Sequence, residues 1–188
     1  MNFAGSMPRY GSEMKPTILR TATAAVSSIF LAGVLVATVM PSASGHAIID
    51  LEGNDAVSGT TSVMKLEIQH GCSDSLPGVV EVQAFVGKPW RKIRPLAVTG
   101  WSTEVSIQKS GGYQITWKNL GEPVAFGTPV FFPLKVNWPK KAGTYGMTVL
   151  QLCPGGSTLW NTEFTAATAD APSPPLTPLP EVQVKKPS

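Results

Sequence analysis

The sequence predicts an all-β fold, an antiparallel β-sandwich of the immunoglobulin-like or cupredoxin-like kind with one disulfide. Short apolar runs alternate with turn residues along most of the chain, and no window keeps a helical period beyond about two turns. The 188 residues include 18 Gly and 17 Pro, too many for a helical bundle. With 43% apolar and only 14% charged residues, the composition also excludes an intrinsically disordered chain.

Eight runs are predicted as strands because apolar, β-branched and aromatic residues recur there between Gly, Pro, Asn and Ser. In one of them, Met64, Leu66 and Ile68 share one face, while Lys65 and Glu67 share the other. The predicted strands are His46–Asp50, Thr61–Ile68, Val79–Val86, Thr103–Gln108, Tyr113–Trp117, Val130–Val136, Thr144–Cys153 and Thr158–Phe164.

Residues 1–45 are interpreted as a signal peptide for export. Three positive charges in the first 20 residues precede an uncharged stretch over residues 21–40, and small residues follow as far as Gly45. Cleavage after Gly45 predicts a periplasmic or secreted protein with 12 basic and 11 acidic residues, a net charge of +1. Cleavage after Ala47 also satisfies the small-residue rule, and an uncleaved membrane anchor is the other alternative.

The exported part is predicted to hold one sandwich domain, residues 46–168, followed by a Pro-rich tail, residues 169–188. Six prolines in the last 18 residues predict that the tail is extended and solvated. No second hydrophobic segment follows the domain, so we expect no C-terminal membrane anchor. The near-neutral charge and the lack of a long Lys or Arg run predict no nucleic-acid partner.

Cys72 and Cys153 are the only cysteines, and both follow the predicted signal peptide. Outside the cytoplasm such a pair usually forms a disulfide. Closing a loop of about 80 residues constrains the unfolded chain by about 4 kcal/mol in the entropic account. A shared metal site is the alternative, which the absence of a CxxC motif disfavours.

No enzyme motif is evident: GxSxG, HExxH, a P-loop and a paired-carboxylate signature are all missing. His46 and His70 are the only histidines, so a general base has few candidates. His70, beside Cys72 at a strand end, is expected to be a turn residue bonded to backbone. A copper-dependent oxidase would need His70 as a second histidine ligand, and we expect the disulfide to hold it elsewhere. The chain is therefore predicted not to be an enzyme.

His46 would become the first residue if cleavage follows Gly45. Its free amine and its ring Nδ1 would then close a six-membered chelate around one metal ion. Reference pKa values are about 7.7–8.0 for an α-amine and about 6.5 for imidazole, so both groups can be neutral ligands near pH 7. Nitrogen donors in a tetragonal arrangement suit Cu(II) best. The alternative is a histidine that stands at the terminus by chance.

Further motifs follow His46 in a fixed order: Gln69-His70-Gly71-Cys72, Val80-Glu81-Val82, Gly100-Trp101, Ile115-Thr116-Trp117, and Leu150-Gln151-Leu152-Cys153 with Gly155-Gly156 and Trp160 after it. This ordered set covers nearly all of residues 46–164 and resembles the YcnI-like copper-binding proteins. The resemblance implies an exported β-sandwich that holds one Cu(II) with an N-terminal histidine, a carboxylate and a nearby tryptophan. It implies His46 as the chelating residue and Trp160 as the indole beside the metal.

The chain departs from the family pattern in two places. The usual Val-Thr-Val and Pro after the histidine are replaced by Ala47-Ile48-Ile49-Asp50, and an acidic residue is missing from Val124–Thr128. The carboxylate ligand therefore stays open: Glu81 is the first choice because it lies in the matching strand, and Asp50 and Glu52 are the second. Glu81 is equally well explained as an ordinary exposed strand residue.

The five tryptophans are mostly expected in the core. Trp160 would approach the chain start only if the first and last strands are neighbours.

The predicted function is copper trafficking or buffering, with a copper transporter or chaperone as partner. The rival is an exported module that binds a protein or adheres to one without metal, through an edge strand or the Pro-rich tail.

Overall fold

A computed structural model describes residues 46–163, 165 and 176–188, which belong to one unit, Pro41–Ser188. The predicted signal peptide, residues 1–45, lies outside the described residues. Within the described part there is no helix that could cross a membrane, and the ordered elements are all strands. They are β1 (Ala47–Asp50), β2 (Ala56–Val57), β3 (Thr61–Ile68), β4 (Glu81–Val86), β5 (Lys92–Pro95), β6 (Trp101–Ile107), β7 (Tyr113–Asn119), β8 (Val130–Asn137), β9 (Gly143–Gly146), β10 (Thr148–Cys153), β11 (Gly156–Trp160) and β12 (Glu181–Lys185).

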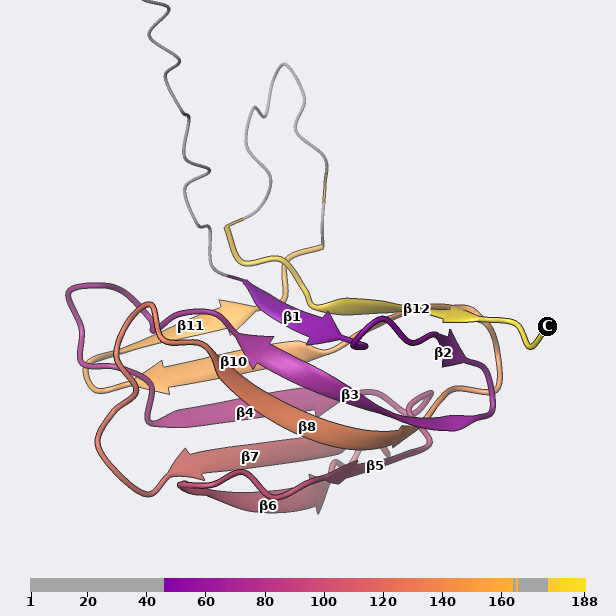
Figure 1. Ribbon diagram of the computed structural model, residues 1–188, viewed down its shortest axis with the longest axis horizontal. Coiled ribbons are helices and arrows are strands. Elements are labelled where there is room, and N and C mark those ends of the chain that lie inside the picture. The colour runs from indigo at the N-terminus through magenta and orange to yellow at the C-terminus, as the bar shows by residue number, and fades with distance from the viewer. Residues whose placement is uncertain (1–45, 164, 166–175) are drawn as a thin grey trace, which may run out of the picture. The chain divides into compact units, whose positions relative to one another are not determined.

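Two antiparallel sheets form the sandwich (Figure 1). One has the strand order β1-β3-β8-β5 and the other the order β11-β10-β4-β7-β6. Each strand that lies within a sheet alternates buried and outward side chains, as β8 does over all eight of its residues. The predicted all-β sandwich is therefore confirmed.

Large side chains from both sheets fill the space between them. Trp117 on β7 stacks on Phe132 on β8, with ring centroids 4.6 Å apart, and Trp90 meets Trp138 at 5.8 Å. Burying one such side chain contributes about 1.5–3 kcal/mol. Other fully buried members of this core include Met64, Leu66, Ile68, Ile115, Leu134 and Met147.

The predicted disulfide is confirmed. Cys72, in the β3–β4 connection, is bonded to Cys153 at the end of β10, with their Cα atoms 6.1 Å apart. The bond joins the loop that follows one sheet's β3 to a strand of the other sheet. It therefore fixes the loop that carries His70 against the end of β10.

A third, small sheet corrects the prediction for the C-terminus. It has the order β2-β12-β9, with β12 parallel to β2 and antiparallel to β9. Val182 and Val184 on β12 are buried, so the solvated tail predicted for residues 169–188 is wrong where β12 forms. The alternation of Glu181–Lys185 is a strand pattern, which the neighbouring prolines obscured. Residues 169–175 of that predicted tail lie outside the described residues.

The strand predictions differ from the structure at a few other points. The run predicted over Thr144–Cys153 is divided at Met147, because β9 before it pairs with β12 whereas β10 after it pairs with β4. β2 and β5 were not predicted. β5 contains one buried apolar residue, Ile93, between two charged ones, so its pattern is too short to be recognised.

Candidate metal site

His46 lies immediately before β1, at the edge of its sheet, and β3 holds its backbone. The carbonyl of His46 accepts the Gln69 N–H at 3.3 Å, which continues the β1–β3 ladder by one residue. The backbone N–H of His46 donates to Gln69 Oε1 at 3.1 Å, and Gln69 Nε2 donates to Glu67 Oε1 at 3.3 Å. The nitrogen that would become the N-terminal amine is thus positioned by a side-chain amide and, through it, by a carboxylate.

The imidazole of His46 contacts the indole of Trp160. Their ring centroids are 6.4 Å apart and the rings meet edge-on, at 78°. Trp160 ends β11, the edge strand of the other sheet, and is only 2% exposed. The two residues that the sequence analysis assigned to one site are therefore neighbours, because β1 and β11 are edge strands that meet on the same side of the sandwich (Figure 1).

His70 contacts the same indole, at a centroid distance of 5.9 Å, and packs on Phe126 at 4.9 Å. The expectation that the disulfide holds His70 elsewhere is wrong: the bond to Cys153 holds His70 beside Trp160. As expected for a turn residue, its Nδ1 lies 2.5 Å from the carbonyl of Gly71. A carbonyl only accepts, so Nδ1 is the donor, and Nε2 is the ring nitrogen left to bind a metal. Metal-binding histidines commonly have this arrangement.

Gln151 is a polar residue at a core position that sequence reasoning did not assign to the site. Its side chain is fully buried: Oε1 accepts the indole N–H of Trp160 at 3.2 Å, and Nε2 donates to the carbonyl of His70 at 2.6 Å. A buried amide with both ends bonded fixes the groups at those ends. The available signal was a Gln between Val149 and Cys153 on the inward face of β10.

The structure places the predicted carboxylates away from His46. Glu81 lies on β4, two strands in from β11, on the face turned away from the core, and its carboxylate accepts from Gln83. Asp50 and Glu52 lie at the opposite end of β1 from His46. Asp50 accepts the N–H of Glu52 at 2.7 Å, and Glu52 pairs with Lys65. The hydrogen bond and the charge of Glu52 raise the pKa of Lys65.

The described residues contain no cluster of three or more His, Cys, Asp or Glu side chains able to hold a metal ion. The chelate predicted for His46 needs one ring and one backbone nitrogen, so it is not such a cluster. Glu67 is linked to His46 through Gln69.

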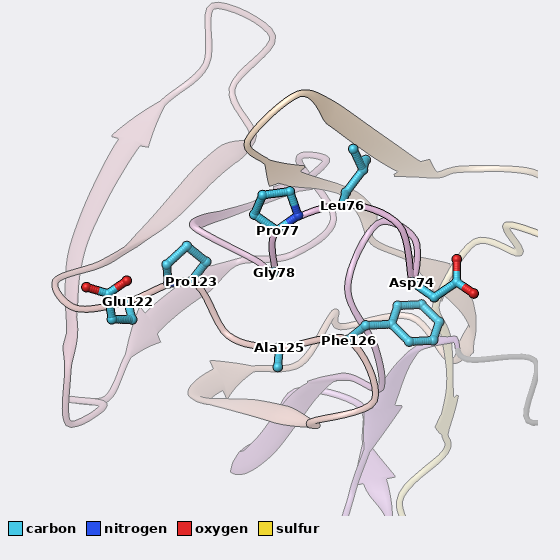
Figure 2. Close-up of a pocket in the computed structure, with 8 residues that line it drawn as sticks. All are labelled: Asp74, Leu76, Pro77, Gly78, Glu122, Pro123, Ala125 and Phe126. Atoms are coloured by element: carbon cyan, nitrogen blue, oxygen red, sulfur yellow. The ribbon is translucent and has the colours of Figure 1, made fainter.

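An open hollow of about 570 Å³ lies beside Phe126, the residue that packs on His70. Asp74 and Phe126 lie at one end of it and Glu122 and Pro123 at the other (Figure 2). Phe126 both lines this hollow and contacts His70. Phe126 is therefore the residue that links His70 to the hollow.

Comparisons with known proteins identify the fold alone. No family model and no curated protein matches the chain. Among solved structures, it is similar to an uncharacterised protein from Nocardia farcinica with an immunoglobulin-like fold, at 20% identity and a TM-score of 0.60 over 74% of this chain and 97% of that one. It is also similar to a cohesin module of a family 33 glycoside hydrolase from Clostridium perfringens, at 17% identity and a TM-score of 0.49 over 76% and 98%. The chain is thus an immunoglobulin-like β-sandwich.

Proposed function

We propose that the chain is an exported, non-enzymatic copper-binding protein that takes up one Cu(II) through His46 at the N-terminus of the mature form. The observation that carries the proposal is the position of His46: it precedes β1 and its ring lies 6.4 Å from the indole of Trp160. Trafficking or buffering of the ion, with a copper transporter or chaperone as partner, is the corresponding role. The resemblance to YcnI-like proteins supports the same assignment.

The chemistry depends on proteolysis before His46. In an uncleaved chain the His46 nitrogen is an amide, whose lone pair is delocalised into the carbonyl, so the neutral amide nitrogen is a poor metal ligand compared with a free amine. After cleavage the nitrogen becomes an amine, which can keep one N–H bonded to Gln69 Oε1 while its lone pair points elsewhere. The structure supports this because the Gln69 acceptor lies at 3.1 Å.

Side chains near His46 can offer the metal ion an oxygen donor and a second imidazole nitrogen. We assign the carboxylate role to Glu67 rather than to Glu81, Asp50 or Glu52, because Glu67 is linked to the His46 nitrogen through Gln69. The imidazole of His70, whose centroid lies 5.9 Å from that of Trp160, is a second nitrogen donor nearby, through its Nε2. The indole N–H is bonded to Gln151, so Trp160 contributes its apolar ring as a cover.

The test combines the mature N-terminus with a copper titration. Mass spectrometry of the exported protein should show a chain that begins at His46, and Cu(II) should quench tryptophan fluorescence with an end point at one equivalent. His46→Ala and acetylation of the amine should each abolish the one-equivalent end point. Trp160→Phe should keep copper binding, measured by calorimetry, while losing most of the quenching.

Two matched variants separate the carboxylates. Glu67→Gln should weaken Cu(II) binding, and Glu81→Gln, which removes the same charge from the other sheet, should not. A chain that begins at Ile48 or keeps its leader, or a His46→Ala protein that binds Cu(II) as tightly as the unchanged protein, would overturn the proposal.

The rival function, a protein-binding module, is favoured by one observation. β6 is an edge strand with both faces exposed, and it presents Val105 and Ile107, 41% and 76% exposed. Removal of the C-terminus does not separate the two functions, because β12 belongs to the fold. Substituting Val105 and Ile107 by Ser separates the two functions. Copper binding should be unchanged in this variant, whereas docking of a partner on β6 would be lost.

A further inference from the structure

A second candidate site lies on the outward face of the four-stranded sheet, far along the chain from His46. Lys92 and Arg94 on β5 and Lys135 and Asn137 on β8 line a hollow of about 210 Å³. In the β5–β8 ladder, Lys92 lies directly opposite Asn137, and Arg94 lies opposite Lys135. The four side chains therefore form a compact square on one face of two paired strands.

The three positive charges in this square form no salt bridge with the residues that the structure describes. The salt bridges of the described residues involve Lys65 and Lys185, and none involves Lys92, Arg94 or Lys135. Like charges placed directly opposite each other destabilise a sheet. Residues 46–188 carry a net charge of only +1, so a general excess of basic residues does not account for the cluster.

The fourth side chain also presents a donor to the hollow. Asn137 lies between Thr61 on β3 and Lys92 on β5, each directly opposite it in its ladder. The hydroxyl of Thr61 donates to Asn137 Oδ1 at 3.0 Å, so the acceptor of this amide is already bonded. Ammonium, guanidinium and amide NH₂ groups are all donors, so the lining side chains offer the hollow only donors.

Protection of a sheet edge explains part of this arrangement but not all of it. Charged residues on an edge strand such as β5 hinder pairing with other chains. Lys135, however, lies on β8, which is paired on both sides, by β3 and β5. The bonded orientation of Asn137 contributes nothing to edge protection either.

We propose that this hollow binds a phosphate group, either in a free phosphate compound or in the headgroup of an anionic lipid. A planar guanidinium matches two phosphate oxygens at once, and ammonium groups add point charges around it. A phosphate group presents more oxygens than a single carboxylate does, so it can accept from several of these donors at once, in a monoester and in a lipid phosphodiester alike. This site is independent of the copper proposal, because neither His46 nor Trp160 takes part in it.

Two probes tell the sources apart in the protein produced from the full chain. One is inorganic pyrophosphate, followed by calorimetry, and the other is a vesicle of phosphatidylcholine with or without phosphatidylglycerol, followed by co-sedimentation. Saturable one-to-one binding of pyrophosphate indicates a free phosphate ligand. Sedimentation only with phosphatidylglycerol vesicles indicates a lipid headgroup.

Charge-matched triple variants show whether the hollow is responsible. Lys92→Gln with Arg94→Gln and Lys135→Gln should weaken binding of the probe about tenfold or more, because charge-assisted hydrogen bonds are lost. Lys109→Gln with Lys140→Gln and Lys141→Gln removes the same net charge from exposed loops and should change binding less than about twofold.

Asn137→Asp provides an independent check, since Thr61 can still donate to it while the new carboxylate repels the anion. Its thermal unfolding should match that of the unchanged protein and its probe binding should fall at least about tenfold. The proposal is wrong if neither probe binds saturably, or if the two triple variants lose affinity equally.

Discussion

Trp160 donates its indole N–H to the buried side-chain carbonyl of Gln151 at 3.2 Å. The other end of the same amide donates to the His70 carbonyl at 2.6 Å, so one buried side chain ties the indole to the loop that carries the second histidine. The bond to Trp160 is buried, so water cannot replace it without opening the core. The arrangement of both histidines around one indole therefore depends on Gln151.

Replacing Gln151 by Leu should destabilise the protein by about 1–3 kcal/mol, because the His70 carbonyl and the Trp160 N–H lose their buried partner. Urea unfolding followed by tryptophan fluorescence measures the loss. Gln83→Leu, on the outward face of β4, serves as the control and should cost less than about 1 kcal/mol. Equal midpoints for Gln151→Leu and the unchanged protein would contradict the role given to this amide.

Removing the disulfide by Cys72→Ala with Cys153→Ala should lower the free energy of unfolding by about 4 kcal/mol, because the bond closes a long loop in the unfolded chain. The loop that carries His70 should also loosen. Hydrogen exchange measured on both proteins would show this as a larger increase in exchange rate, relative to the unchanged protein, in residues 69–80 than in β7. A variant that unfolds at the same urea concentration as the unchanged protein would show that the bond constrains little.

Val184→Ala on β12 should destabilise the protein by about 2 kcal/mol, because Val184 is fully buried. Gln183→Ala, one residue away and exposed, loses a surface hydrogen bond to Thr144 and should cost less than about 1 kcal/mol. Thermal unfolding of the two variants distinguishes a packed strand from a solvated tail. If both substitutions had the same small effect, β12 would not contribute to the fold.

Copper binding should weaken as the pH falls from about 7.5 to about 5.5, because protons compete with the metal for the amine and for the imidazole. Both groups bind a metal only in their neutral form, so the sign of the effect is fixed: lower pH means lower affinity. Calorimetric titrations at the two pH values, with a competing chelator of known affinity, measure the change. Affinity that is independent of pH in this range would exclude nitrogen ligands of this kind.

Much of the sandwich could be predicted because its strands alternate strictly between buried and outward residues. The run Thr61–Ile68 was predicted with the bounds of β3. β12 was missed because the six prolines around it are typical of an extended, solvated segment, and only its pairing with β2 and β9 shows otherwise. A buried valine pair in a proline-rich sequence is a weak local signal.

The candidate site was only partly predictable, for a related reason. His46 and Trp160 were assigned from chain position and from a family resemblance, and the structure places them in contact. The contact between His70 and Trp160 arises from the meeting of two sheets, and the linkage of Glu67 to His46 through Gln69 arises from the pairing of β1 with β3. No spacing within one strand encodes such tertiary neighbours.

β12 is the central strand of the order β2-β12-β9, so β2 and β9 are joined only through it. Ala56–Val57 and Glu181–Lys185 lie far apart along the chain, so this small sheet closes only when a late segment returns to an early one. A protein cut by a protease just before Glu181 would keep the strands of both large sheets, but Ala56 and the backbone of β9 would be left uncovered.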